Sequence, residues 1–302
     1  MKSYALFQEY IWLVNTIYKA GKITLEDINR RWLETETSEG MPIARSTFNR
    51  HRDAILDIFG IVIECDRKDG FRYYIDNSEV LEEDSIQNWM FSTMSVNSIL
   101  AENKGVHDRI VLESIPSDGE NLHKFIDAMK RGVSIRVTYR KYGGEEPSEI
   151  LVEPYFVKLF NKRWYGIVRK TTDEGWMFVL AFDRVLSLEL STEKFLYPKG
   201  FDPVSFFRNN YGILWVEDTP VEKVTIRAYG KQVYYLRDLP LHHSQVEIAT
   251  AEDYSDFEFT LRPTPDFCTP LLSKGPFIKV LSPRWLADEI KKQHLEAVKL
   301  YE

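Results

Sequence analysis

The stretch "RWYGIVRK", residues 163–170, sets a Trp and a Tyr side by side between cationic residues. Aromatic and β-branched residues of this kind favour a β-strand. Strand side chains alternate between two faces, which places Arg163, Tyr165, Ile167 and Arg169 on one face and Trp164, Gly166, Val168 and Lys170 on the other. A Tyr between two arginines offers a stacking plane for a base and cations for a phosphate. An ordinary barrel strand with a core Trp and surface arginines is the alternative.

The sequence around this strand alternates with a period of two from Val133 onward. Further short runs of this kind are "VSIRVTY", "EILVEPYFVKLF", "WMFVLAF" and "RVLSLEL". They are separated by "KYGGEEPS", "NK" and "TTDEG", which have the composition of turns. Several short antiparallel strands in succession predict a small curled sheet or barrel.

Three of these segments resemble the WYL domain, a family named for a Trp-Tyr-Leu motif. They are "RWYGIVR", "SIRVTYRKYG" and "LAFDRV", the last with an Asp-Arg pair. The segments "STFNRHRDAILDIFGIVIECD", "PLHHSQ" and "LSKGPFIKVLSPRWL" resemble the flanking regions of WYL-type transcription regulators, so the resemblance covers nearly the whole chain. It implies an Sm-like β-barrel that senses a nucleic-acid or nucleotide-like effector. The positions that match the motif are Tyr139, Trp164, Tyr165, Asp183 and Arg184.

The chain departs from the family pattern at two positions. Gly166 stands where the motif has Leu, and Ala181 stands where many members have an Arg. The second departure removes a cation, so the effector of better-known members need not be the effector here.

The predicted effector-binding residues are Tyr139, Arg163, Tyr165, Arg169, Arg184 and His242. Tyr139 shares a strand face with Ile135 and Val137, so it reaches a ligand only if the barrel interior is open. The adjacent His242 and His243 have no Asp, Glu or Cys at metal-binding spacing, which disfavours a metal site. A ligand or interface contact and an ordinary hydrogen-bonded turn histidine both remain open for His242.

The first 78 residues predict a winged helix-turn-helix. Apolar residues recur at helical spacing from Leu6 to Ile17, and Thr24 is a plausible N-cap for a second helix. A third helix is expected in "ARSTFNRHRDAILDIFG", followed by "IVIECDRKDGFRYYI", in which Asp69-Gly70 marks a hairpin turn. Three helices followed by a β-hairpin is the order of elements in a winged helix.

Cationic and polar residues gather at the front of the third helix and at the hairpin tip. A recognition helix contacts base edges with its N-terminal residues, and a hairpin tip suits phosphates. The predicted DNA-binding residues are Arg45, Ser46, Thr47, Asn49, Arg50 and Arg52 of the helix and Arg67, Lys68 and Arg72 of the hairpin. A merely solvated helix face is the alternative.

The chain is predicted to be a multidomain α+β protein. Its expected parts are a winged helix-turn-helix at 1–78, a helical connector at 79–131, a small Sm-like antiparallel β-barrel at 132–197 and a C-terminal α+β unit at 198–302. The connector is equally well a dimer surface or a plain spacer. In the C-terminal unit, Ser282-Pro283 is expected to start a helix with Ser as N-cap. For that unit the resemblance implies dimer contacts and ligand binding beside the barrel.

Composition narrows the class of protein. A length of 302 residues with 44% hydrophobic and 28% charged residues favours a globular protein of two or three domains. Two cysteines far apart in sequence predict a reducing compartment without disulfides. The absence of a signal-like or membrane-spanning apolar run favours a cytoplasmic location and no membrane partner. With a net charge of −7, DNA binding must come from local patches.

The combined prediction is a homodimeric, ligand-responsive transcription regulator of bacterial type. It binds double-stranded DNA at a two-fold operator and senses a nucleotide or single-stranded nucleic acid. The alternative is a nucleic-acid sensor in a defence or DNA-damage module that acts through a protein partner. The sequence has no phosphate-binding Gly-rich loop followed by Lys, no H-E-x-x-H, no C-x-x-C and no Ser elbow flanked by glycines, so no enzyme, metal or cofactor is expected. A nuclease with dispersed acidic ligands is a further alternative.

Overall fold

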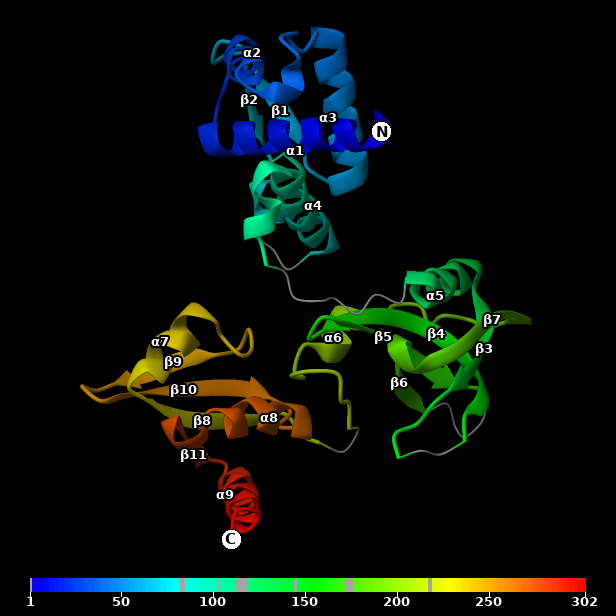
Figure 1. Cartoon of the computed structure of the whole chain (residues 1–302), viewed down its shortest axis with the longest axis vertical. Helices are drawn as coiled ribbons and strands as arrows, with labels where there is room; N and C mark the ends of the chain where they lie inside the picture. Colours follow the sequence, from blue (N-terminus) through cyan, green and yellow to red (C-terminus); the bar gives the residue numbers. More distant parts are fainter. Residues whose placement is uncertain are drawn as a thin grey trace. The chain divides into compact units, whose positions relative to one another are not determined.

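A computed structural model of the chain describes residues 2–81, 85–102, 104–111, 119–143, 146–171, 176–216 and 219–302. The chain forms two compact units, residues 1–113 and 114–302 (Figure 1). Both units combine helices with antiparallel sheets, which confirms the multidomain α+β prediction. No helix in the described part is long and apolar enough to cross a membrane.

The first unit has the element order of a winged helix. It contains α1 (Lys2–Ala20), α2 (Leu25–Leu33), the 3₁₀ turn η1 (Glu36–Ser38), α3 (Arg45–Phe59), β1 (Ile63–Asp66) and β2 (Arg72–Ile75). Thr24 caps α2 by accepting a hydrogen bond from the Asp27 backbone N–H. An isolated antiparallel bridge pairs Ile23 with Tyr73 of β2, on the side of β2 away from β1. The hairpin is thereby held against the turn between α1 and α2.

One apolar core joins these elements. Its fully buried side chains include Leu13 and Ile17 of α1, Ile28 of α2, and Phe48, Ile55 and Phe59 of α3. The Phe48 ring meets Tyr73 of the hairpin edge to face, with centroids 4.6 Å apart. The helix and the hairpin that carry the predicted DNA contacts therefore move as one body.

The segment predicted as a connector contributes helices to both units. After η2 (Ser78–Leu81), α4 (Ile86–Glu102) buries Phe91 against Phe59 of the first unit, with ring centroids 5.6 Å apart, and η3 (Lys104–Arg109) follows. α5 (Gly119–Arg131) buries Phe125 and Ala128 on the sheet of the second unit. The turn expected at Pro116 lies outside the described residues.

The second unit begins with a five-stranded antiparallel sheet. Its strands are β3 (Val133–Tyr139), β4 (Ser148–Phe160), β5 (Arg163–Lys170), β6 (Met177–Ala181) and β7 (Val185–Lys194), with the 3₁₀ turn η5 (Phe182–Arg184) between the last two. The order is β6-β5-β4-β3-β7, and α5 precedes it in sequence, which is the Sm-like arrangement. The small antiparallel barrel is confirmed. The turns predicted at 141–148 and 171–175 lie partly outside the described residues.

A βαββαβ unit follows the barrel. After α6 (Pro203–Phe207), its elements are β8 (Glu222–Tyr229), α7 (Lys231–Asp238), β9 (Val246–Thr250), β10 (Tyr254–Leu261), α8 (Pro265–Ser273), η6 (Gly275–Phe277), β11 (Ile278–Ser282) and α9 (Arg284–Lys299). The strand order β11-β8-β10-β9 is that of ferredoxin-like folds. Ser282 is not the N-cap of α9, because it still pairs with Thr225 as the last residue of β11.

The segment between barrel and ferredoxin-like unit covers the outer face of the barrel. Phe207 of α6 is buried against Tyr155, Phe156, Tyr165 and Ile167. The turn after α6 is held by Asp266 of α8, whose Oδ2 accepts hydrogen bonds from the backbone N–H groups at 213 (2.7 Å) and 214 (2.8 Å). This covering segment decides which faces of the barrel a ligand can reach.

Candidate nucleic-acid and effector sites

The front of α3 is exposed at the positions predicted to read DNA. Arg45, Ser46, Asn49 and Arg50 lie at the surface, whereas Phe48 is completely buried. The helix period produces this division, since residues three and four apart share a face. Thr47 is half-buried. The front of α3 therefore presents two arginines and an Asn, the side chains that pair with base edges in a major groove.

Arg52 points to the hairpin. Its Nε donates a hydrogen bond to the carbonyl oxygen of Ile63 at 2.8 Å, and Nη2 donates to the same oxygen. The guanidinium also lies over the Tyr73 ring, 5.6 Å from the centroid. This predicted DNA contact instead joins α3 to the hairpin.

Arg52→Ala is expected to lower the free energy of unfolding of the first unit by about 1.5–3 kcal/mol, because a charged donor to a half-buried carbonyl is lost. Arg50→Ala should change it by less than about 0.5 kcal/mol, as surface substitutions do. Urea titrations of both variants, followed by circular dichroism, measure the difference. Equal stability of the two variants would contradict the structural role of Arg52.

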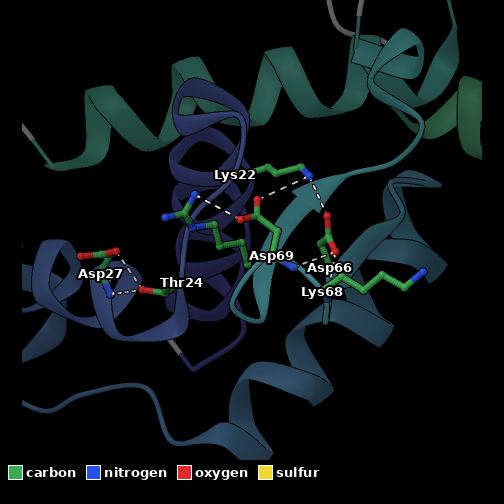
Figure 2. Close-up of polar contacts among 7 residues, drawn as sticks. Lys22, Thr24, Asp27, Asp66, Lys68 and Asp69 are labelled. Carbon is green, nitrogen blue, oxygen red and sulfur yellow. Dashed lines mark hydrogen bonds and ion pairs between the residues drawn. The ribbon is translucent and has the colours of Figure 1, made fainter.

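The hairpin tip carries a network of opposite charges (Figure 2). Lys22 forms ion pairs with Asp66 at 2.7 Å and Asp69 at 3.6 Å, and Arg72 pairs with Asp69 at 3.6 Å. The hydrogen bond from Lys22 lowers the pKa of Asp66. Lys68 points away from this network in Figure 2. The positive charge of Arg72 is thus balanced by Asp69 of the same hairpin tip.

Arg67 and Lys68 are both exposed in the loop between β1 and β2. The backbone N–H groups of Lys68 and Asp69 donate to Asp66 Oδ1, each at 3.1 Å, which fixes the loop. Arg67 and Lys68 are thus exposed cations of the hairpin tip, whereas Arg72 pairs with Asp69 of the loop.

Four of the six predicted effector residues lie near one another at the β3 and η5 end of the barrel: Tyr139, Arg163, Tyr165 and Arg184. The Arg184 guanidinium lies 3.6 Å from the ring centroid of Tyr142 and 4.8 Å from that of Tyr139. It also donates a hydrogen bond to the Arg140 carbonyl at 2.9 Å. Tyr142 is a member of this cluster that the sequence did not indicate.

Arg163 is held at the same end of the sheet. It pairs with Asp183 at 2.5 Å and lies 5.6 Å from the Tyr165 ring centroid. A side-chain hydrogen bond with Tyr142 raises the pKa of Arg163, and the ion pair with Asp183 adds to this. The guanidinium remains charged at any physiological pH.

Tyr165 faces the covering segment and is only 6% exposed. Burial raises the pKa of its hydroxyl. The predicted alternation of β5 is confirmed, since Tyr165 and Ile167 pack with Phe207, whereas Trp164 and Val168 pack in the core with Phe125. A base could stack on Tyr165 only if the covering segment moved away.

Arg169 and His242 lie apart from this cluster. Arg169 pairs with Glu153 at 3.6 Å. His242 is buried, and its Nε2 and that of His243 both donate to the carbonyl oxygen of Arg208, at 3.0 and 2.6 Å. Burial lowers the pKa of His242 to about 4, so it is neutral near pH 7. The structure places His242 in a hydrogen-bonded turn.

A pocket of about 730 Å³ opens beside Tyr139. Its lining residues are Tyr139, Lys141, Ser148, Ile150, Lys170, Trp176, Met177 and Phe178. Aromatic rings with two ammonium groups and a hydroxyl suit a planar, negatively charged ligand. Sequence analysis identified only Tyr139 here; the alternation of β5, which places Lys170 on the same face as the buried Val168, was the available signal for Lys170.

A half-buried lysine stands on the outer face of the barrel. Lys158 Nζ lies 3.9 Å from the centroid of the Phe207 ring, and burial lowers the pKa of this lysine to about 8. Lys158 is paired in the sheet with Tyr165, so it belongs to the face under the covering segment. No feature of the sequence singled it out.

Comparisons with known proteins identify two domains in the second unit. A WYL domain matches residues 120–190, and a WCX domain matches residues 220–298. The second unit therefore carries a WYL domain followed by a WCX domain. The WYL match comprises α5 and most of the five-stranded sheet, and the WCX match comprises the ferredoxin-like unit.

Two solved structures are similar to this chain at low identity. One is the proteasome accessory factor B/C (PafBC) of Arthrobacter aurescens, with 18% identity and a TM-score of 0.37 over 95% of this chain and 46% of that chain. The other is a CRISPR Cas-related protein, with 13% identity and a TM-score of 0.42 over 92% of this chain and 70% of that chain. This chain spans less than half of the PafBC chain. The comparison with curated proteins gives no match.

The structure accounts for the Gly that replaces Leu in the WYL motif. A Cβ at Gly166 would lie 2.6 and 2.8 Å from carbons of the Phe125 ring and 3.0 Å from the Phe182 ring. Those two rings lie 5.2 Å apart in the barrel core. They occupy the space beside the Gly166 backbone that a larger side chain at this position would need.

Proposed function

We propose that the chain is a WYL-domain transcription regulator that binds duplex DNA through its first unit. The observation that supports this most directly is the exposed front of α3, where Arg45, Asn49 and Arg50 project outward while Phe48 anchors the helix in the core. Arg67 and Lys68 of the hairpin supply phosphate contacts on the flank. Arg52 holds helix and hairpin together so that both reach one duplex.

The proposed effector is a planar anion of nucleotide type, bound by the WYL domain. Two features support this proposal. The pocket beside Tyr139 is lined by aromatic rings and two lysines, and Arg184 lies over the rings of Tyr139 and Tyr142. An effector that favours one arrangement of a homodimer five- to 150-fold provides about 1–3 kcal/mol of coupling. That is enough to change the occupancy of a two-fold operator.

Footprinting on the DNA upstream of the protein's own gene tests the DNA-binding proposal. The expected result is a protected region with two half-sites about one helical turn apart. Uniform affinity for unrelated duplexes would instead favour a nucleic-acid sensor that acts through a protein partner. We further propose that the chain binds without catalysis; labelled DNA incubated with the protein and Mg²⁺ should stay intact.

Arg184→Ala is expected to raise the concentration of short single-stranded oligonucleotide needed for a half-maximal effect on DNA binding by at least tenfold. The reason is that Arg184 provides the charge beside Tyr139 and Tyr142. Mobility shifts titrated with the oligonucleotide measure this. Arg136→Ala on β3, which removes an exposed arginine paired with Glu149, is the control and should leave the response unchanged. The same loss in both variants would refute this effector site.

A further inference from the structure

The exposed face of α4 carries no charge. No Asp, Glu, Lys or Arg occurs between Ile86 and Ala101, although 28% of the chain is charged. Helices at the surface of soluble proteins normally turn charged side chains to water. An exposed helix face without charged residues is typical of a surface that another molecule covers in the functional state.

Four apolar residues and one threonine of α4 follow the spacing of a helix-pairing seam. The α4 seam consists of Ile86, Trp89, Thr93, Val96 and Leu100, at alternating intervals of three and four residues. Ile86, Trp89 and Val96 are 68%, 46% and 56% exposed. The opposite face packs Phe91 and Met94 into the core of the first unit. The seam is thus an outward surface on a firmly anchored helix.

The seam is self-complementary about Thr93. If two α4 helices pair antiparallel with Thr93 on the two-fold axis, Trp89 faces Val96 of the second copy, and Ile86 faces Leu100 of the second copy. A large side chain then meets a small one on each side of the axis, as close packing requires. In a two-fold symmetric contact, each residue near the axis lies opposite the same residue of the second copy. A charged residue there would therefore face a like charge. The absence of charged residues between Ile86 and Ala101 is therefore compatible with pairing of two α4 helices.

We propose that α4 pairs antiparallel with α4 of a second copy of this chain. The inference deepens the proposed homodimer and therefore rests on the proposed function. α4 contacts α1 and α3, so pairing through α4 sets the separation of the two α3 helices. One helix pair about two heptads long is a small interface, and a dissociation constant on the order of micromolar is expected without DNA.

Cysteine cross-linking of the full chain tests the geometry. In a background with Cys65→Ser and Cys268→Ser, Thr93→Cys should form a disulfide-linked dimer under mild oxidation at least tenfold faster than Tyr301→Cys, an exposed site near the C-terminus. Trp89→Cys should cross-link to itself slowly. Fast self-linking of Trp89→Cys with slow linking of Thr93→Cys would overturn the antiparallel arrangement.

A matched pair of charge substitutions tests the surface itself. Val96→Glu should weaken the dimer at least tenfold in sedimentation velocity, whereas Val298→Glu on α9, at a valine of similar exposure, should not. Circular dichroism checks that both variants fold. A dimer that survives Val96→Glu, or that is lost with Val298→Glu alone, would overturn the proposal, as would a monomer in the unmodified chain at all concentrations.

The outcomes separate this inference from the proposed function. A monomer that still protects two half-sites refutes the α4 contact and leaves DNA binding in place. A dimer that cross-links at Thr93 but shifts no DNA refutes the regulator proposal and leaves the contact in place. Cross-links from Thr93 only to other parts of the same chain would show that the chain itself covers the seam, and the proposal would fail.

Discussion

A chain that carries Arg50→Ala is expected to lose its sequence-specific mobility shift while its fold is retained. Arg50 is exposed on the front of α3. An arginine that contacts a guanine edge contributes about 1–3 kcal/mol of discrimination, and a two-fold operator loses this contact in both half-sites. The expected loss for a dimer is therefore about 30-fold or more. Titration of labelled operator DNA, with unrelated DNA of equal length as reference, measures it.

Arg284→Ala is the matched control, because Arg284 lies on α9 with a side chain that is 95% exposed. It removes the same charge and should leave the shift unchanged. Lys68→Ala offers a second comparison, since loss of a phosphate contact should weaken binding to all sequences and reduce the salt slope by about 1. If Arg50→Ala behaves like Lys68→Ala, Arg50 contacts the backbone of DNA rather than its bases.

The local pattern of the sequence predicted the elements that carry these sites. A period of two identified the barrel strands, and the alternation around Tyr165 assigned both faces of β5 correctly. The third helix was predicted as well, and in the structure the buried Phe48 and Phe59 lie on its inner face. Periodicity succeeds in such cases because each side of an element meets one environment along its whole length.

What the sequence did not predict depends on contacts between distant residues. Arg52 looks like its neighbour Arg50, and only the fold brings the Ile63 carbonyl to it. Tyr165 has the flanks of a ligand contact, but a segment some forty residues further along, around Phe207, covers it. Cation type and spacing identify a candidate side chain. They do not identify its acceptor when that acceptor comes from another element.

Gly166→Ala is expected to destabilise the WYL barrel by about 1–3 kcal/mol, and Gly166→Leu, which restores the motif residue, by more. The added Cβ would come within 3.0 Å of the Phe125 ring, and that ring is fully buried. The barrel must then expand or force Phe125 into a poor rotamer. Calorimetric scans of the full chain, in which the barrel transition shifts to lower temperature, measure the effect. Gly119→Ala is the control, because a Cβ there meets nothing within 4 Å.

The same contact predicts a rescue. Phe125→Leu removes ring atoms from the space beside Gly166, so Gly166→Ala should cost less in that background than in the natural chain. In a double-mutant cycle the two changes should couple by about 0.5–3 kcal/mol in the favourable direction. Additive effects would show that Phe125 does not occupy the space of the motif leucine. Coupling would show that the chain exchanged one large residue of the barrel core for another, with α5 supplying a ring where the WYL strand lost its side chain.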